Sequence, residues 1–89
     1  MLIEVFGLEC PKCKTTLRVL QATAKRLGID AEVKFIKNLK QFDERGVNRT
    51  PAVFINGQKI SEGGVPGKSL AEGWIRAAQA REAEEESDE

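Results

Sequence analysis

The only two cysteines of the chain, Cys10 and Cys13, are separated by two residues, so their thiols are close enough to form a disulfide. An apolar run over residues 2–6 precedes them, and a helical pattern that begins near Pro11 follows. Cys10 is therefore expected at a helix N-terminus, where unpaired backbone amides and the helix dipole favour a thiolate. In that setting a thiol pKa falls from about 8.5 to between ~3.5 and 7.5. This placement of a C-x-x-C pair predicts a redox-active dithiol.

The residues around the cysteines are expected to tune this thiolate. Pro11 suits the first helical turn, because its missing amide hydrogen would have had no partner within the helix. Lys12 and Lys14 add positive charge beside the first cysteine, whereas Glu9 opposes them.

Two other interpretations of the pair stay open: an unreactive pair whose second cysteine packs in the core, and half of a zinc site. Zinc prefers four ligands, mostly Cys or His. The chain has no His and no third Cys, so we expect no metal.

The composition predicts one small domain outside the membrane. The chain has 89 residues, of which 40% are hydrophobic and 31% charged. No apolar run approaches the ~20 residues of a membrane-spanning helix. The N-terminus lacks the basic and apolar regions of a secretory signal. Two cysteines in such a chain are typical of a reducing compartment, so we expect a cytoplasmic protein.

The net charge of zero conceals an uneven distribution. Residues 1–81 hold all fourteen basic residues but only eight of the fourteen acidic ones. We therefore expect a domain over residues 1–81 and an acidic tail over residues 82–89 that forms a solvated, frayed helix end. The basic residues are scattered rather than clustered, so nucleic acid is not an expected partner.

Hydrophobic periodicity predicts the first half of the fold. Strands are expected over residues 2–6 and 30–36, with a helix over residues 11–27 between them. Such a unit makes the two strands parallel, and the second strand is expected at a sheet edge. Glu4 interrupts the first strand. An acid that faces water is favoured there over one that relays the proton of the second thiol.

The second half predicts a short helix, a hairpin and a last helix. Asn38 is the expected cap of the short helix, with Leu39, Phe42 and Val47 on its inner side. Asn-Gly at residues 56–57, between two apolar runs, predicts a type I′ hairpin. The last helix is expected to begin between residues 67 and 69, after a loop. Its expected inward residues are Leu70, Trp74, Ala77 and Ala78.

Three motifs in this order resemble one known family. The Cys-Pro-Lys-Cys motif at residues 10–13 resembles the C-P-x-C of glutaredoxins. Thr50-Pro51 before a strand resembles the Thr–cis-Pro segment of the thioredoxin/glutaredoxin superfamily, and Gly-Gly-Val-Pro at residues 63–66 precedes the last helix. Together they resemble the small prokaryotic thioredoxin-like proteins described as redox-active disulfide proteins or glutaredoxin-like thioredoxins. The resemblance implies an α/β, thioredoxin-like fold of order βαβαββα, with a four-stranded mixed sheet flanked by three helices.

The resemblance also implies roles at matching positions. Cys10 would be the attacking nucleophile and Cys13 the resolving thiol of a thiol–disulfide oxidoreductase. Pro51 would follow a cis peptide bond. The enzyme would be a monomer that requires no cofactor, and its partner would be a disulfide-bearing protein. Substrate would dock along Thr50, Pro51, Gly63 and Gly64.

The sequence departs from the family pattern at two points. The single Trp lies in the last helix rather than beside the cysteines. Val65-Pro66 replaces the acidic pair that follows Gly-Gly in glutaredoxins, so the reductant is either glutathione or an upstream thioredoxin reductase. The alternative function is a soft-metal, metalloid-binding or redox-sensing module that uses the same two thiols.

Overall fold

A computed structural model describes the backbone of residues 1–87 and the side chains of residues 1–84. Asp88 and Glu89 of the predicted acidic tail lie outside the described residues. The order of elements is the predicted one, which confirms the α/β fold class. The elements are β1 (Leu2–Phe6), α1 (Pro11–Arg26), β2 (Glu32–Ile36), α2 (Leu39–Glu44), β3 (Ala52–Ile55), β4 (Gln58–Glu62) and α3 (Lys68–Ser87).

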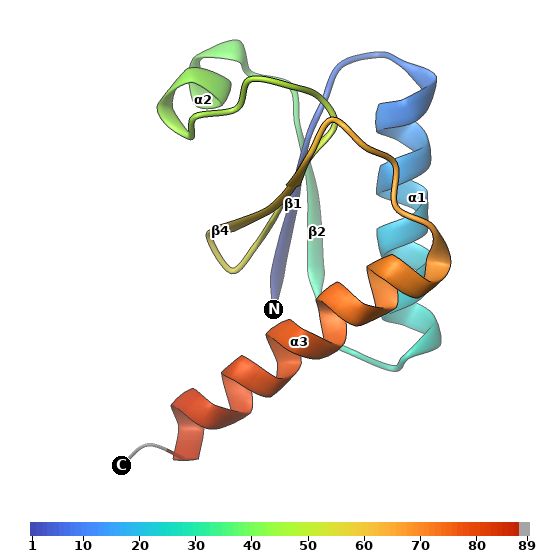
Figure 1. The fold of residues 1–89 in the computed structure, drawn as a ribbon, viewed down its shortest axis with the longest axis vertical. Helices are drawn as coiled ribbons and strands as arrows, with labels where there is room; N and C mark the ends of the chain where they lie inside the picture. The colour runs from blue at the N-terminus through green and yellow to red at the C-terminus, as the bar shows by residue number, and fades with distance from the viewer. Residues whose placement is uncertain (88–89) are drawn as a thin grey trace.

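The four strands form one mixed sheet in the order β2-β1-β3-β4. β1 is parallel to β2 and antiparallel to β3, and β3 and β4 form an antiparallel hairpin. β2 is therefore an edge strand, as predicted. In Figure 1, α1 and α3 lie on one side of the sheet and α2 on the other.

Side-chain alternation along the strands divides the core between the two faces of the sheet. On one face, side chains of β1 and β3 pack against α1 and α3. On the other face, Phe6 and Phe54 pack against Phe42 of α2, with the Phe6 and Phe42 rings 5.6 Å apart. The larger cluster contains Ile3, Val5, Leu20, Ala24, Val53, Ile55, Ala71, Ile75 and Ala78.

Helix α1 carries the cysteine pair, and its buried stripe sets its orientation. Buried Thr16 and Thr23 donate their hydroxyl hydrogens to the carbonyls four residues earlier, at 2.9 and 2.7 Å. No polar side chain of the stripe is therefore left unsatisfied. The helix ends at Arg26 rather than at Leu27, which is the C-cap, and Gly28 follows with a φ of 68°. This positive φ is the left-handed conformation that favours glycine after a helix.

Three predicted core positions in the other helices are wrong. Leu39 and Leu70 are 67% and 54% exposed, and Ala77 is also exposed. The inward stripe of α3 is Ala71, Ile75 and Ala78. This stripe follows the same helical spacing as the predicted one, but it is rotated around the helix by the packing of α3 on the sheet.

The expectation that Glu4 faces water is also wrong. β1 is an interior strand, and Glu4 is only 8% exposed. Arg45 donates two hydrogen bonds to its carboxylate, at 2.9 and 3.2 Å, and these raise the pKa of Arg45. The guanidinium also lies 4.5 Å from the centre of the Phe54 ring. Since this cluster occupies the face that carries α2, Glu4 is directed away from α1, and its position does not support a proton relay.

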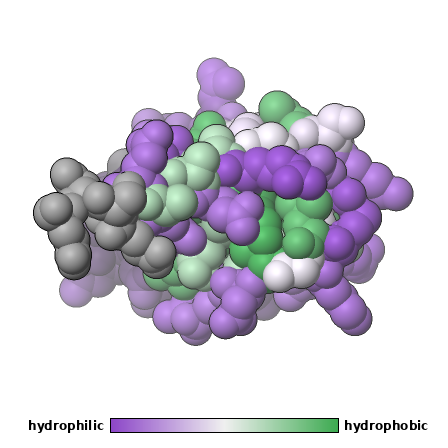
Figure 2. Space-filling model, turned by 90° about the horizontal axis from the view of Figure 1, so that it is seen from below, coloured by the Kyte–Doolittle hydropathy of each residue, from purple (hydrophilic) through white to green (hydrophobic). Residues whose placement is uncertain are grey.

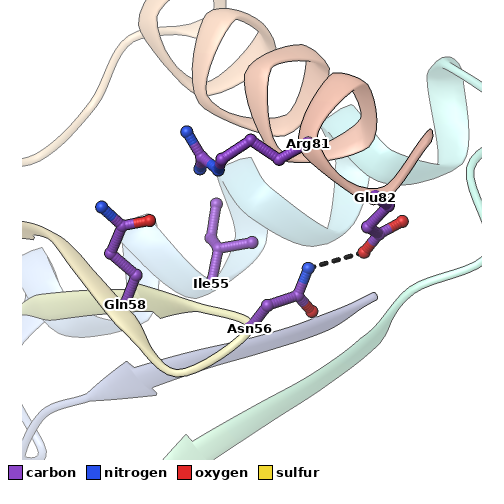
Figure 3. A pocket seen from close by; sticks show the side chains of 5 residues that line it. All are labelled: Ile55, Asn56, Gln58, Arg81 and Glu82. Carbon is purple, nitrogen blue, oxygen red and sulfur yellow. Dashed lines mark hydrogen bonds between the residues drawn. The ribbon is translucent and has the colours of Figure 1, made fainter. Parts of the chain in front are cut away.

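The hairpin has the predicted type I′ character, since Asn56 and Gly57 both have positive φ, at 51° and 84°. The Asn56 side chain accepts from the Leu2 amide (2.9 Å) and donates to the Glu82 carboxylate (2.6 Å). Glu82, which begins the predicted tail, therefore contacts the hairpin. Figure 3 shows Asn56 and Glu82 beside a cavity of about 390 Å³, which Ile55, Gln58 and Arg81 also line.

This hairpin cavity lies at the end of β1 opposite the cysteine pair. Figure 2 views the molecule from below the orientation of Figure 1, and hydrophilic side chains cover most of that face around a smaller hydrophobic area. Among the described residues, no helix is long and apolar enough to cross a lipid bilayer.

Candidate active site

Both cysteines lie where β1 passes into α1. Cys10 is the N-cap residue of α1, with extended backbone angles, and Pro11 is the first helical residue. The Cys13 amide donates to the Cys10 Sγ at 3.3 Å, so this sulfur satisfies one of the free amides at the helix start. The location at a helix N-terminus is as predicted, and both thiols are free.

The two thiols differ in exposure. Cys10 is half-buried, whereas Cys13 is fully buried and its Sγ accepts from the Leu8 amide at 3.4 Å. Gly7 creates the space for Cys13, because a Cβ at Gly7 would lie 2.7 Å from the Cys13 Cβ and 2.8 Å from its Sγ. This role of Gly7 was not predicted. The available signal was a glycine directly after the first strand and three residues before the first cysteine.

The pKa values of the two thiols shift in opposite directions. Hydrogen bonds from the Cys13 thiol and then the Cys13 amide lower the pKa of Cys10, and the amide and charge of Lys12 lower it further. Burial raises the pKa of Cys13, and the hydrogen bond with Cys10 and the charge of that thiolate raise it further. The site therefore favours one thiolate, on Cys10, beside a protonated Cys13.

The charge of Glu9 is largely compensated. Lys37 and Lys14 both form ion pairs with its carboxylate, the latter at 3.2 Å. Their hydrogen bonds and charges lower the pKa of Glu9. Glu9 thus opposes the Cys10 thiolate less than its position in the sequence suggested, while Lys12 has no ion-pair partner among the described residues.

The predicted Thr-Pro segment lies beside the buried thiol. The Thr50–Pro51 peptide bond is cis, as the resemblance implied. The Thr50 side chain is hydrogen-bonded to the Cys13 thiol, which lowers the pKa of Cys13 against the larger effect of burial. The Gly63 amide donates to the Pro51 carbonyl at 2.8 Å, and Gly64 is exposed next to it.

The structure thus brings the predicted site residues from three segments to one end of the sheet. In Figure 1 the loop before α1, the segment before β3 and the loop after β4 lie together at the end opposite the N-terminus. Two apolar side chains in these loops were not predicted as part of the site: Leu8 and Val65 are 45% and 41% exposed. Within the described part of the chain, no group of three or more His, Cys, Asp or Glu residues is arranged to hold a metal ion.

Comparison with known proteins identifies the family. Residues 1–76 match the sequence profile of a family described as "Thioredoxin domain". The chain belongs to the thioredoxin family. A thioredoxin of Methanothermobacter thermautotrophicus is 32% identical over 68 residues, which cover 76% of this chain and 88% of the relative. A thioredoxin of Methanocaldococcus jannaschii is 33% identical over 66 residues, which cover 74% of this chain and 76% of the relative.

A solved thioredoxin shares the fold. Thioredoxin 1 from the thermophilic eubacterium Thermosipho africanus superposes with a TM-score of 0.59 at 26% identity, over 99% of this chain and 100% of that structure. Membership of the thioredoxin family assigns a thiol–disulfide oxidoreductase type of function at the family level. The narrower glutaredoxin-like assignment stays a prediction.

Proposed function

We propose that this thioredoxin-family protein reduces disulfides in cytoplasmic proteins through a reversible Cys10–Cys13 dithiol. The opposite character of the two thiols is the observation that carries the proposal. Cys10 is accessible and its pKa is lowered, whereas Cys13 is fully buried and its pKa is raised. The nucleophile in thiol–disulfide exchange is a thiolate that can reach its target, and Cys10 meets both requirements.

In the first step, the Cys10 thiolate attacks one sulfur of the substrate disulfide. A bond forms between Cys10 Sγ and that sulfur, the substrate S–S bond breaks, and the other substrate sulfur leaves as a thiolate. Cys13 stays protonated during this attack, because burial and the neighbouring thiolate both disfavour its ionisation. The product is a mixed disulfide between Cys10 and the substrate.

In the second step, Cys13 resolves the mixed disulfide. Once Cys10 is bonded to the substrate, its sulfur no longer carries a negative charge. That charge therefore no longer raises the pKa of Cys13. Cys13 then loses its proton to the departing substrate thiolate and attacks Cys10 Sγ. The Cys10–Cys13 disulfide forms, the second substrate thiol is released, and two electrons have passed from the protein to the substrate.

The substrate would lie along the segments that surround Cys10. Thr50 precedes β3, so its backbone lies outside the strand-to-strand pairing of the sheet and is available to an extended peptide. The space beside Gly64 is open and lets a peptide backbone approach closely, whereas a Cβ at the neighbouring Gly63 would lie 3.1 Å from the Arg49 side chain. Exposed Leu8 and Val65 offer apolar contacts to it.

The oxidised Cys10–Cys13 pair must be reduced again before the next cycle. We propose that a thiol reductant does this, either an upstream thioredoxin reductase or glutathione. Both steps use only the two cysteine sulfurs and the substrate disulfide that they reduce, so the proposed reaction requires no bound metal or organic cofactor. We propose that the protein acts as a monomer.

The test is reduction of insulin disulfides driven by dithiothreitol, with the wild type compared with Cys10→Ser and Cys13→Ser. We expect turnover above the dithiothreitol background for the wild type and none for Cys10→Ser. No turnover by the folded, fully reduced wild type would contradict the proposal. The metal content of protein purified without chelator would then test the soft-metal alternative.

A further inference from the structure

Two cavities lie next to one another along α1, and Cys10 lines the first of them. This first cavity has a volume of about 310 Å³, and its lining includes Cys10, Lys14 and Arg18. The second cavity, of about 330 Å³, is lined by Arg18 together with Val19, Ala22 and Lys68, among others. Arg18 lines both cavities, and the two together are here termed the α1 groove.

The α1 groove carries positive charge that the described part of the protein does not neutralise. Lys14 pairs with Glu9 at 3.2 Å, and Arg26, which also lines the second cavity, pairs with Glu72 at 3.0 Å. Arg18 and Lys68, by contrast, form no ion pair with any described residue. The groove therefore offers two unpaired cations to a bound partner.

The second cavity of the α1 groove also has apolar lining residues. Val19 is half-buried and packs against the main core cluster, and Ala22 beside it is exposed. A short polypeptide segment with acidic side chains and an apolar residue would complement both properties. Pairing of unlike charges across a contact favours such a partner and slows the association of a basic one.

We propose that the α1 groove selects disulfide substrates that carry acidic side chains three or four residues from the reactive cysteine. This inference rests on the proposed function and names its preferred substrates. The spacing follows from geometry. Arg18 lies eight residues after Cys10, about 12 Å along a helix with a rise of 1.5 Å per residue. An extended substrate segment advances about 3.3 Å per residue, so three to four residues span that length.

The expected preference is modest, since Arg18 and Lys68 are exposed. Exposed ion pairs correspond to about a 1.5- to 5-fold change in an equilibrium or rate ratio. Salt should weaken it, because the Debye length falls to about 3 Å at 1 M ionic strength.

The experiment uses the full chain and three matched disulfide-linked peptide dimers. Each peptide has one cysteine, and Glu, Ala or Lys occupies the third and fourth residues after it. A second set of peptides places the same residues before the cysteine. Wild type should reduce one of the Glu peptides with a severalfold higher kcat/KM than the Lys peptide. Arg18→Glu should reverse this ratio, and Arg18→Lys should retain it. Lys40→Glu makes a comparable charge change on α2, across the sheet, and should leave the ratio unchanged.

The possible results separate the preference for acidic substrates from the proposed function. Equal rates for Glu, Ala and Lys peptides would overturn this inference and leave the proposed function intact. Equal effects of Arg18→Glu and Lys40→Glu would also overturn it, because net charge alone would then set the ratio. Reduction of no peptide, including the Ala peptide, would overturn the proposed function and the inference together. If Arg18→Glu does not fold, Arg18→Gln combined with Lys68→Gln should abolish the preference.

Discussion

Replacing Gly7 by alanine should push the buried cysteine out of its position. The added Cβ would lie 2.7 Å from the Cys13 Cβ, 2.8 Å from its Sγ and 3.1 Å from a ring carbon of Phe35. Carbon atoms in contact are normally about 3.5–4.0 Å apart. The first turn of α1 must therefore move by most of an ångström, since the Cys13 Cβ is fixed to the helix backbone and cannot rotate away.

The size of the effect follows from this overlap. Overpacking a core position typically costs about 1–3 kcal/mol. We expect about 2 kcal/mol for Gly7→Ala, because Cys13 belongs to α1 and Phe35 to β2 of the sheet, so neither can move freely. For a domain of this size, each kcal/mol corresponds to roughly 4–8 °C in Tm, so Tm should fall by about 8–16 °C. Displacement of Cys13 should also slow resolution and prolong the mixed disulfide.

Thermal unfolding of the reduced protein followed by circular dichroism measures the stability effect. Gly73→Ala is the matched control, since nothing lies within 4 Å of a Cβ at this exposed position of α3. It should raise stability by about 0.5–1 kcal/mol, because alanine is the better helix former. A Gly7→Ala protein as stable as the wild type, with unchanged disulfide-exchange kinetics, would show that a Cβ at residue 7 does not displace Cys13.

Three other predictions concern charge and protonation. Lys12→Glu should raise the pKa of Cys10, and an alkylation rate whose pH profile does not move would contradict this. Arg45→Met leaves Glu4 buried without its partner and should lower the free energy of unfolding by about 3 kcal/mol. The double variant with Glu4→Leu should regain most of that loss, and chemical denaturation measures both values. Burial holds the pKa of Cys13 above the ordinary thiol value, so the unfolded chain ionises first as pH rises. In Cys10→Ser, this contribution to stability should be complete below about pH 8.5 and should be lost as pH rises through the folded pKa, while further replacement of Cys13 by Ala should remove the dependence.

Local signals were sufficient for the elements that position the site. The apolar run of β1, Pro11 at the start of α1 and Asn56-Gly57 in the hairpin are each determined by near neighbours in sequence. Their backbone preferences act over a few residues, so the sequence predicts them directly. The parallel β1–α1–β2 unit follows from the length of the connection.

Long-range contacts explain the failures. Arg45, which makes Glu4 a buried residue, is 41 positions away in the sequence. The tight contact of Gly7 involves Phe35 as well as Cys13, so it depends on how β2 and α1 pack. For Leu70, the orientation of α3 on the sheet decides which of two adjacent helix stripes is buried.

The cis peptide before Pro51 illustrates a third kind of prediction. Only about 5–6% of X–Pro bonds in folded proteins are cis, so composition alone favours the trans form. The prediction came from the resemblance of the Thr-Pro segment to a family motif, and the structure has the cis bond. The roles of Thr50, Gly63 and Gly64 in binding substrate stay predictions.

If Cys10 attacks and Cys13 resolves, the mixed disulfide on Cys10 can be trapped when Cys13 is replaced. Reduced Cys13→Ser and Cys10→Ser proteins are each mixed with a disulfide-linked peptide, quenched with acid and analysed by mass spectrometry. We expect a covalent adduct of one peptide on Cys10 in Cys13→Ser and little or none in Cys10→Ser, because the buried Cys13 is a poor nucleophile. Faster adduct formation on Cys13 in the folded Cys10→Ser protein would show that Cys13, and not Cys10, is the attacking thiol.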